Sequence, residues 1–411
     1  MKKAVLLAAL LVGIVWNLRL AIADLAARRN SPDGTRLAMR WMPGNGAYAA
    51  QLADELYASD PVGAKSLLQK AVRLNRFDAA SWIQLGLLCE SRNDLPQAEE
   101  SLLQAARVDS TFLPSWSLAN FYFRHEQADR FWNWAQKAAQ MVPDDATPLF
   151  RLAWYANPNA VEIENRLQMK RPAVEVQLVN FLITQGDPPA VSQAASHLLA
   201  SGAGDSTEVL LSACDWLLAQ KRPDLALGLW NGLASRISYP APGGGSLMTN
   251  GSFSKPPTSH GFDWHLLTVN GVSLNADPNA LGFEFSGQEP DGFTLMTQTV
   301  PVKPGKGYTL AIDYRTSDIA PGSGLSWAVS DEHTGAVLAR TANLAAEQGG
   351  PAYACFTAPD GAAFIRLSLD YQRQPGTVRV EGKLALREVR LSAGDCPAQK
   401  NSASGAASDG F

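Results

Sequence analysis

A 34-residue period in the placement of aromatic and small residues restricts the fold of this chain more than any other feature. Trp82 opens the sequence W-x2-L-G, and aromatic residues stand one period before it, at Tyr48, and one period after it, at Trp116. Ala98 is preceded in the same way by Ala64. Helical units of this length bury a core only by stacking on their neighbours. The period therefore predicts a row of helical hairpins.

The unit around Trp82 resembles the tetratricopeptide repeat (TPR), a helix–turn–helix motif of this period. Gly86 and Ala98 are small enough to let its two helices approach closely, and Leu102 fills the space beside them. The match extends over residues 45–143, although Trp132 stands where a small residue is expected, and it fades beyond that point. Helical spacing of apolar residues continues, so we expect an all-α solenoid of about ten helices over residues 45–235.

The resemblance to TPR proteins implies a protein partner on the concave face of the solenoid. Aromatic residues are dense between Trp116 and Trp154, and basic residues lie among them. The alternative is that the aromatic rings pack between helices and that the charges form a solvated face. The candidate partner-binding residues are Trp116, Tyr122, Arg124 and Arg130.

Residues 1–29 have the layout expected of an export or anchoring signal. Two lysines precede an apolar run from Ala4 to Trp16, and apolar residues resume after Arg19 as far as Ala23. Secretory signals have this layout, whereas a membrane span needs about 20 residues. Three interpretations remain open: an uncleaved inner-membrane anchor, which is favoured, a cleaved signal, and a buried helix.

The charges around this segment bear on its orientation. Lys2 and Lys3 favour a cytoplasmic N-terminus with the bulk of the chain in the periplasm, although Arg28 and Arg29 weaken that expectation. Cleavage would instead give a soluble periplasmic or secreted protein.

The composition changes at residues 236–245, where Pro240, Pro242 and three glycines predict a linker. Apolar residues then alternate with polar ones in short segments separated by turn residues. Residues 246–396 are therefore expected to form an all-β jelly-roll sandwich of nine or ten strands. Residues 397–411 are rich in Ser, Gly and Ala and are expected to be disordered.

Within this half the sequence resembles carbohydrate-binding-module jelly rolls. The residues that carry the resemblance are Asn250, Gly251, Phe253, Phe262, Trp264, Val389 and Leu391. The family often holds a structural calcium with acidic residues, but Ser254 and Arg387-Glu388 replace those acids here. Calcium requires oxygen ligands, so we do not predict the ion.

Sugar binding needs aromatic faces beside a few polar groups. The alternative for the two tryptophans is burial in the core, whereas Tyr314 and Tyr371 lie near strand ends, where exposure is expected. The glycan-binding candidates are Trp264, Tyr314, Arg315, Trp327 and Tyr371, with Asp313, Gln298 and Asp370 beside them.

The four cysteines are too few and too scattered for a metal cluster. In an oxidising compartment Cys355 and Cys396 are candidates for a disulfide, while Cys89 and Cys214 are expected to be buried thiols. The net charge of −4 excludes a nucleic-acid binder held by phosphate contacts. No residue pattern indicates a catalytic, cofactor-binding or metal site, so we expect no enzyme and no cofactor.

The order of anchor, repeats and jelly roll resembles the repeat proteins that accompany exopolysaccharide or O-antigen assembly in Gram-negative bacteria. The resemblance implies a non-catalytic periplasmic scaffold that binds an assembly protein through the repeats and glycan through the sandwich. Two alternatives stay open: a protein–protein adaptor without sugar binding, and a glycan-modifying enzyme, which would need two placed carboxylates.

Overall fold

The computed structural model describes residues 2–202, 206–239, 245–277, 280–345 and 349–394. The chain divides into two compact units, Met1–Leu182 and Ile183–Phe411. The predicted linker at 236–245 lies inside the second unit, and its residues 240–244 are outside the described part, as is the tail at 397–411. The domain boundaries expected from the sequence therefore stay predictions.

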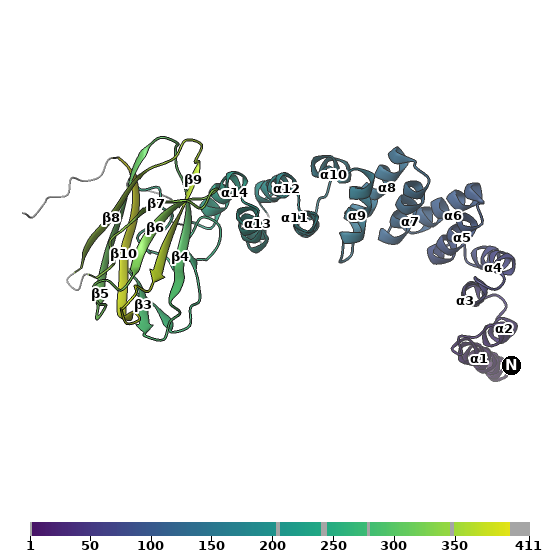
Figure 1. Ribbon diagram of the computed structural model, residues 1–411. Helices are drawn as coiled ribbons and strands as arrows, with labels where there is room; N and C mark the ends of the chain where they lie inside the picture. Colours follow the sequence, from purple (N-terminus) through teal and green to yellow (C-terminus); the bar gives the residue numbers. More distant parts are fainter. Residues whose placement is uncertain (1, 203–205, 240–244, 278–279, 346–348, 395–411) are drawn as a thin grey trace, which may run out of the picture. The chain divides into compact units, whose positions relative to one another are not determined.

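The first unit is all-helical (Figure 1). Consecutive helices form pairs, and the pairs α3–α4, α5–α6 and α7–α8 coincide with the three units expected from the period. The TPR-like helical fold is thereby confirmed. The helices are α1 (Lys2–Ala27), α2 (Pro32–Trp41), α3 (Gly46–Leu56), α4 (Pro61–Leu74), α5 (Ala79–Ser91), α6 (Leu95–Val108), α7 (Phe112–Arg124), α8 (Ala128–Met141), α9 (Thr147–Ala156), α10 (Ala160–Leu167) and α11 (Pro172–Gln185), whose last residues belong to the second unit.

Small residues set the distance between paired helices. A Cβ atom on Gly86 would lie 2.7 Å from Cγ of Leu102 and 3.2 Å from the carbonyl oxygen of Ala98. Both of these residues are fully buried. The same arrangement recurs in α3–α4, where a Cβ on Gly46 would lie 2.9 Å from the carbonyl oxygen of Ala71. In these two pairs the glycine therefore lets the helices approach more closely than a Cβ atom would allow without rearrangement.

The third pair departs from the pattern because its small residues are replaced. Trp132 is buried on α8, and the guanidinium of Arg166 on α10 lies 5.4 Å from the centre of its ring. Phe131 contacts the same indole at a centroid distance of 4.8 Å. Helix α8 also packs against α10 here, and the regular period of the sequence ends at this pair.

The second unit combines the last helices with two antiparallel sheets (Figure 1). Its helices are α12 (Pro188–Ala200), α13 (Thr207–Ala219) and α14 (Pro223–Arg236). Its strands are β1 (His265–Leu266), β2 (Val272–Asp277), β3 (Ala280–Ser286), β4 (Gly292–Pro301), β5 (Gly307–Ser317), β6 (Leu325–Asp331), β7 (Val337–Arg340), β8 (Gly350–Thr357), β9 (Phe364–Gln372) and β10 (Glu381–Ala393).

The strands form one sheet in the order β1-β4-β9-β6-β7, called sheet A here, and a second in the order β2-β3-β10-β5-β8, called sheet B. Alternate residues of each strand point between the sheets, where Trp264, Trp327, Leu310 and Leu367 are completely buried. The outer positions carry polar residues, as the period-two alternation requires. The predicted β-sandwich is confirmed.

The motif around Asn250 is structural. The Trp264 indole N–H donates to the carbonyl oxygen of Asn250 (3.1 Å), and the Val389 N–H donates to that of Gly251 (2.8 Å). A Cβ on Gly251 would lie 2.3 Å from the Val389 carbonyl oxygen, so only glycine fits. Phe253 packs beside the indole at a centroid distance of 5.7 Å. The residues that carry the sequence resemblance thus connect the loop before β1 to β10.

Helices α13 and α14 pack directly on the sandwich. Asp215 of α13 accepts hydrogen bonds from the N–H of Gly261 (2.7 Å), and its other oxygen lies 2.5 Å from Nδ1 of His260. Trp230 of α14 packs over Gly261 and contacts Phe262 at a centroid distance of 6.5 Å. The segment that follows α14 continues this contact, because the Tyr239 hydroxyl donates to the buried Asp263.

Candidate functional site

A recess of about 580 Å³ lies at one end of the outer face of sheet A. We call it the outer groove. Strands β4, β6, β7 and β9, with the residue before β6 and the segments that follow β7 and β9, contribute its lining. Its side chains are polar apart from those of Phe293 and Tyr371, which lie on the inner side of the sheet. The lining residues are Gly292, Phe293, Thr294, Gly324, Ser326, Arg340, Thr341, Asn343, Asp370, Tyr371, Gln372 and Gln374.

Asp370 is the centre of the outer groove. In the sheet register it lies between Thr294 of β4 and Ser326 of β6. Its carboxylate accepts hydrogen bonds from the hydroxyls of Thr294 (2.9 Å) and Ser368 (3.0 Å), and from Arg340 (3.4 Å). Because its neighbours on the sheet are short side chains, the carboxylate stands at the floor of an open recess.

An aromatic pair lies beneath the groove, on the core side of sheet A. The rings of Phe293 and Tyr371 are stacked, with centroids 4.8 Å apart. The Tyr371 hydroxyl accepts from the N–H of Val380 (3.1 Å), which fixes that ring in the core. Phe293 stands opposite Tyr371 in the register, so its side chain is on the same inner side of sheet A, where it packs against the edge of the core. The outer face of the groove therefore offers a carboxylate, a guanidinium, amides and hydroxyls, which are groups that hydrogen-bond the hydroxyls of a sugar.

The expected exposure of Tyr314 and Tyr371 is wrong. Tyr314 is 6% exposed and Tyr371 is 1% exposed, and both lie in the core between the sheets. Trp264 and Trp327 are completely buried there too and contact one another at a centroid distance of 5.6 Å. These four rings have both faces covered by protein, so none of them presents a face on which a sugar can stack.

The polar candidates do not form one site. Arg315 is exposed and Asp313 partly exposed, both on the outer face of sheet B, whereas Asp370 is on the outer face of sheet A. Gln298 is buried and donates to the carbonyl oxygen of Thr249 (2.9 Å). Only Asp370 and Tyr371 of the sequence candidates line the outer groove. Arg340 and Asn343 were missed, because only the arrangement of neighbouring strands brings them beside Asp370.

The partner-binding candidates have intramolecular contacts in the first unit. Tyr122 is buried and donates to Glu99 (2.9 Å), which also accepts from Arg130 (2.5 Å). Arg124 is bonded to Glu90. Trp116 is half-buried and stacks on Phe112, with centroids 5.9 Å apart. Of the four, Trp116 presents the most apolar surface on α7, and Leu113 beside it is 53% exposed.

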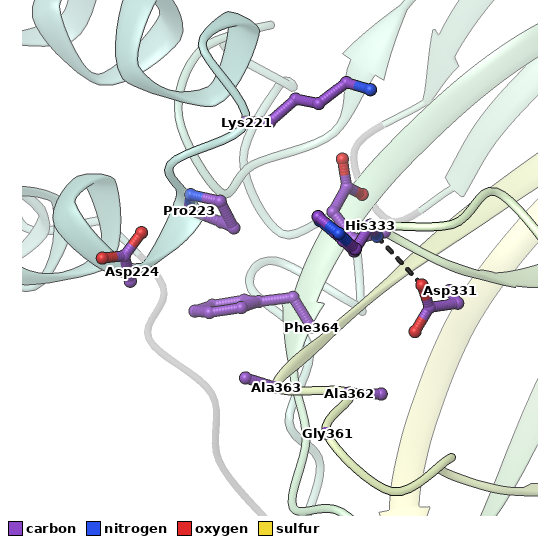
Figure 2. A pocket seen from close by; sticks show the side chains of 10 residues that line it. Lys221, Pro223, Asp224, Asp331, His333, Gly361, Ala362, Ala363 and Phe364 are labelled. Carbon is purple, nitrogen blue, oxygen red and sulfur yellow. Dashed lines mark hydrogen bonds between the residues drawn. The ribbon is translucent and has the colours of Figure 1, made fainter. Parts of the chain in front are cut away.

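A second, smaller pocket of about 230 Å³ lies where the turn between α13 and α14 meets the loops of the sandwich (Figure 2). It is lined by Lys221, Asp224, Asp331, Glu332 and His333, and Phe364 covers one side. Each carboxylate is already bound. Backbone N–H donation from Thr334 (2.6 Å) keeps the pKa of Asp331 below its usual range. Arg222 does the same for Asp224, and Arg366 bonds Glu332 at 2.5 Å.

This pocket does not suit glycoside hydrolysis. The reaction needs one carboxyl that is protonated near neutral pH, and burial or a like charge must raise its pKa. The pKa values of Asp331 and Asp224 are lowered instead, and Glu332 forms an ion pair with Arg366. In the described part of the chain, no cluster of three or more His, Cys, Asp or Glu side chains could hold a metal ion.

The cysteines on the helices differ in oxidation state from the cysteine on the sandwich. Cys89 and Cys214 are free and buried, and burial raises the pKa of the Cys214 thiol to about 12. Cys355 on β8 is disulfide-bonded. Its expected partner, Cys396, lies outside the described residues.

No protein-family model matches the chain, and no curated protein matches it. A solved CBM4 structure has 12% identity, with coverage of 36% of this chain and 99% of that one and a TM-score of 0.29. YrrB, a TPR protein with an unusual peptide-binding site, has 12% identity, coverage of 50% and 93%, and a TM-score of 0.26. PilF of Pseudomonas aeruginosa has 16% identity, coverage of 55% and 93%, and a TM-score of 0.27. At such scores the fold assignment rests on the helices and sheets described above.

Proposed function

We propose that this protein is a non-catalytic periplasmic scaffold that binds a protein partner through its helical pairs and a glycan through the outer groove. The outer groove is the observation that carries the proposal. It combines the Asp370 carboxylate, the Arg340 guanidinium and the Asn343 amide in an open recess on the outer face of sheet A. An open polar groove suits the hydroxyl groups of an extended chain of sugars rather than a small apolar ligand.

The protein-binding part of the proposal rests on the surface of α7. Phe112 and Trp116 stack on each other, and Leu113 is largely exposed beside them. Trp116 follows Phe112 by four residues and Leu113 by three, so it neighbours both side chains on the surface of the helix. Aromatic side chains such as Trp116 often contribute a large part of the binding energy at protein interfaces.

Two observations support a periplasmic location on the inner membrane. Within the described residues, α1 is the one helix whose length and composition would allow it to cross a membrane, over Leu10–Ala27, although signal sequences meet the same criteria. The disulfide at Cys355 favours an oxidising compartment such as the periplasm. A periplasmic scaffold on the inner membrane that holds both protein and glycan fits cell-surface polysaccharide assembly or export.

The experiment is a glycan array that contains bacterial cell-surface polysaccharides, probed with the full chain in detergent and followed by calorimetry. Asp370→Ala and Arg340→Ala should each weaken binding about tenfold, because each removes a charged hydrogen-bonding group. Glu388→Ala and Arg390→Ala are the matched controls, since these residues form an exposed ion pair on β10 of sheet B.

Unchanged binding in the groove variants would place the glycan elsewhere. No binding to any polysaccharide would leave a protein adaptor and remove sugar recognition from the proposal. Release of a modified sugar from the array would instead support a glycan-modifying enzyme.

A further inference from the structure

Helix α1 is part of the first folded helical pair as well as a candidate membrane span. Ala23 and Ala26 are buried against α2 and α3. A Cβ on Gly34 of α2 would lie 2.5 Å from the Ala26 carbonyl oxygen, which is the close approach seen between α5 and α6. Gln51 of α3 also donates to the Ala27 carbonyl oxygen (2.9 Å). The last two turns of α1 are therefore held by the repeat.

Helix α2 runs back along α1 toward the apolar part of that helix. Gly34, near the start of α2, meets Ala26. The carbonyl oxygen of Trp41, at the end of α2, accepts from Arg19, two turns earlier on α1 (3.1 Å). The end of α2 and the residues after it thus lie level with Arg19.

The large apolar side chains of α1 before Arg19 are exposed. Those from Leu6 to Leu18 that the structure describes are at least 55% exposed. From Lys3 to Leu18 the helix rises about 22 Å, which is shorter than the roughly 30 Å of a bilayer core, so the side chains of Lys3 and Arg19 would have to extend to the headgroups on the two sides. Trp16 and Trp41 both border a recess beside Arg19. Tryptophans at such a level mark a membrane–water interface.

This placement brings a basic recess close to the lipid headgroups. The recess, of about 720 Å³, is lined by Arg29, Arg36 and Arg40, with Asp33 as the single carboxylate in its lining. Arg36 is paired with Asp33 (2.9 Å). Arg40, in the last turn of α2, is exposed and has no ion pair within the described residues. The recess therefore carries an excess of positive charge, and it extends along α2 from the end level with Ala26 to Arg40, which lies close to the level of Arg19.

We propose that the end of α2 rests on the membrane surface, where Arg36 and Arg40 bind the phosphate groups of anionic phospholipids. The inference rests on the membrane anchor of the proposed function. Arginine pairs with phosphate through two parallel N–H donors, and basic residues close to an anionic surface are attracted to it. The solenoid would then be oriented by two attachments, the span and the end of α2.

The test uses the full chain in nanodiscs made of phosphatidylcholine alone or of an equimolar mixture with phosphatidylglycerol. Amide hydrogen exchange is followed in α2 and in the segment Met42–Asn45. We expect exchange there to slow about fivefold or more in the anionic discs, and the protection to fall at high salt. The double variant Arg36→Gln/Arg40→Gln should lose this protection, whereas Arg107→Gln/Arg151→Gln, on exposed residues of α6 and α9, should keep it.

The outcomes separate the two proposals. Equal protection in both kinds of disc, or loss of protection in the control variant, overturns headgroup binding while the anchor stands. A chain that does not remain with the discs overturns the anchor itself. Exchange in detergent micelles shows whether the double variant keeps α2 folded.

Discussion

The guanidinium of Arg124 makes two hydrogen bonds, of 2.8 and 2.7 Å, with the carboxylate of Glu90, which stands 34 residues earlier in the chain. His125 adds a contact of 3.0 Å to the same carboxylate. Because the separation equals the repeat period, the two residues occupy equivalent places at the ends of α5 and α7. The bond therefore ties one helical pair to the next.

Glu90→Gln should lower the free energy of unfolding at neutral pH, because it removes the charged partner of Arg124. The loss should be only about 1 kcal/mol, because Arg124 is exposed and solvent screens the pair. Burial opposes ionisation of Glu90, but the bonds from Arg124 and His125 outweigh it and lower its pKa. The stabilisation is thus present above the unfolded pKa and is lost as the pH falls through the folded one. Urea unfolding of both proteins at neutral and acidic pH measures the difference, which should shrink in acid. A constant difference would contradict the assignment.

Gly86→Ala should destabilise the first unit by about 1–3 kcal/mol, because the new Cβ would overlap Leu102. Gly228→Ala on α14 is the control. A Cβ there meets no atom within 4 Å, so this change should be neutral or stabilising by up to about 1 kcal/mol. Thermal unfolding of the two variants measures both effects. Equal melting temperatures would show that the close crossing of α5 and α6 is not required.

Asp263 should give a pH dependence opposite to that of Glu90. Burial raises its pKa more than the hydrogen bonds from Thr258 and Tyr239 lower it. The folded state therefore favours the protonated carboxyl, and this contribution is present below the unfolded pKa and lost as the pH rises through the folded one. Relative to Asp263→Asn, the natural protein should lose stability between acidic and neutral pH, as measured by urea unfolding. A gain over that range would show that Asp263 is stabilised as the anion.

Thiol labelling should distinguish the three described cysteines. Native protein at about pH 8 should not react with iodoacetamide at Cys89 or Cys214, because buried thiols with raised pKa values form little thiolate. In denaturant both should be labelled without a reductant. The peptide that contains Cys355 should be labelled only after reduction, as peptide mass spectrometry will show. Labelling of Cys355 without reductant would remove the support for an oxidising compartment.

The helical fold was predictable because its key contacts are local. Gly86, Ala98 and Leu102 lie within one helical hairpin, so their spacing alone indicates how two helices cross. The pair α1–α2 was not predicted, although Gly34 meets Ala26 in the same way. The apolar run at the start of α1 indicates a signal or a membrane span, and that pattern hides the helical pair.

The candidate site was less predictable, for two reasons. Strand alternation already groups Tyr314 with Ile312, and Tyr371 with Leu369, on the inner faces, so their burial could have been inferred from the period of two. The meeting of Asp370 with Arg340 could not, because it depends on the register between β9, β6 and β7, which the sequence does not specify.

The contacts of Asp215 and Trp230 with the loop at Gly261 make α13 and α14 part of the outer wall of the sandwich. Gene fusion or recombination that moved the β-strands alone to another protein would uncover Phe262 and leave Asp263 without its tyrosine. The segment that would have to be transferred intact is therefore larger than the jelly roll and includes α13 and α14. It carries its own piece of solenoid, onto which helical repeats could be added or removed without disturbing the groove.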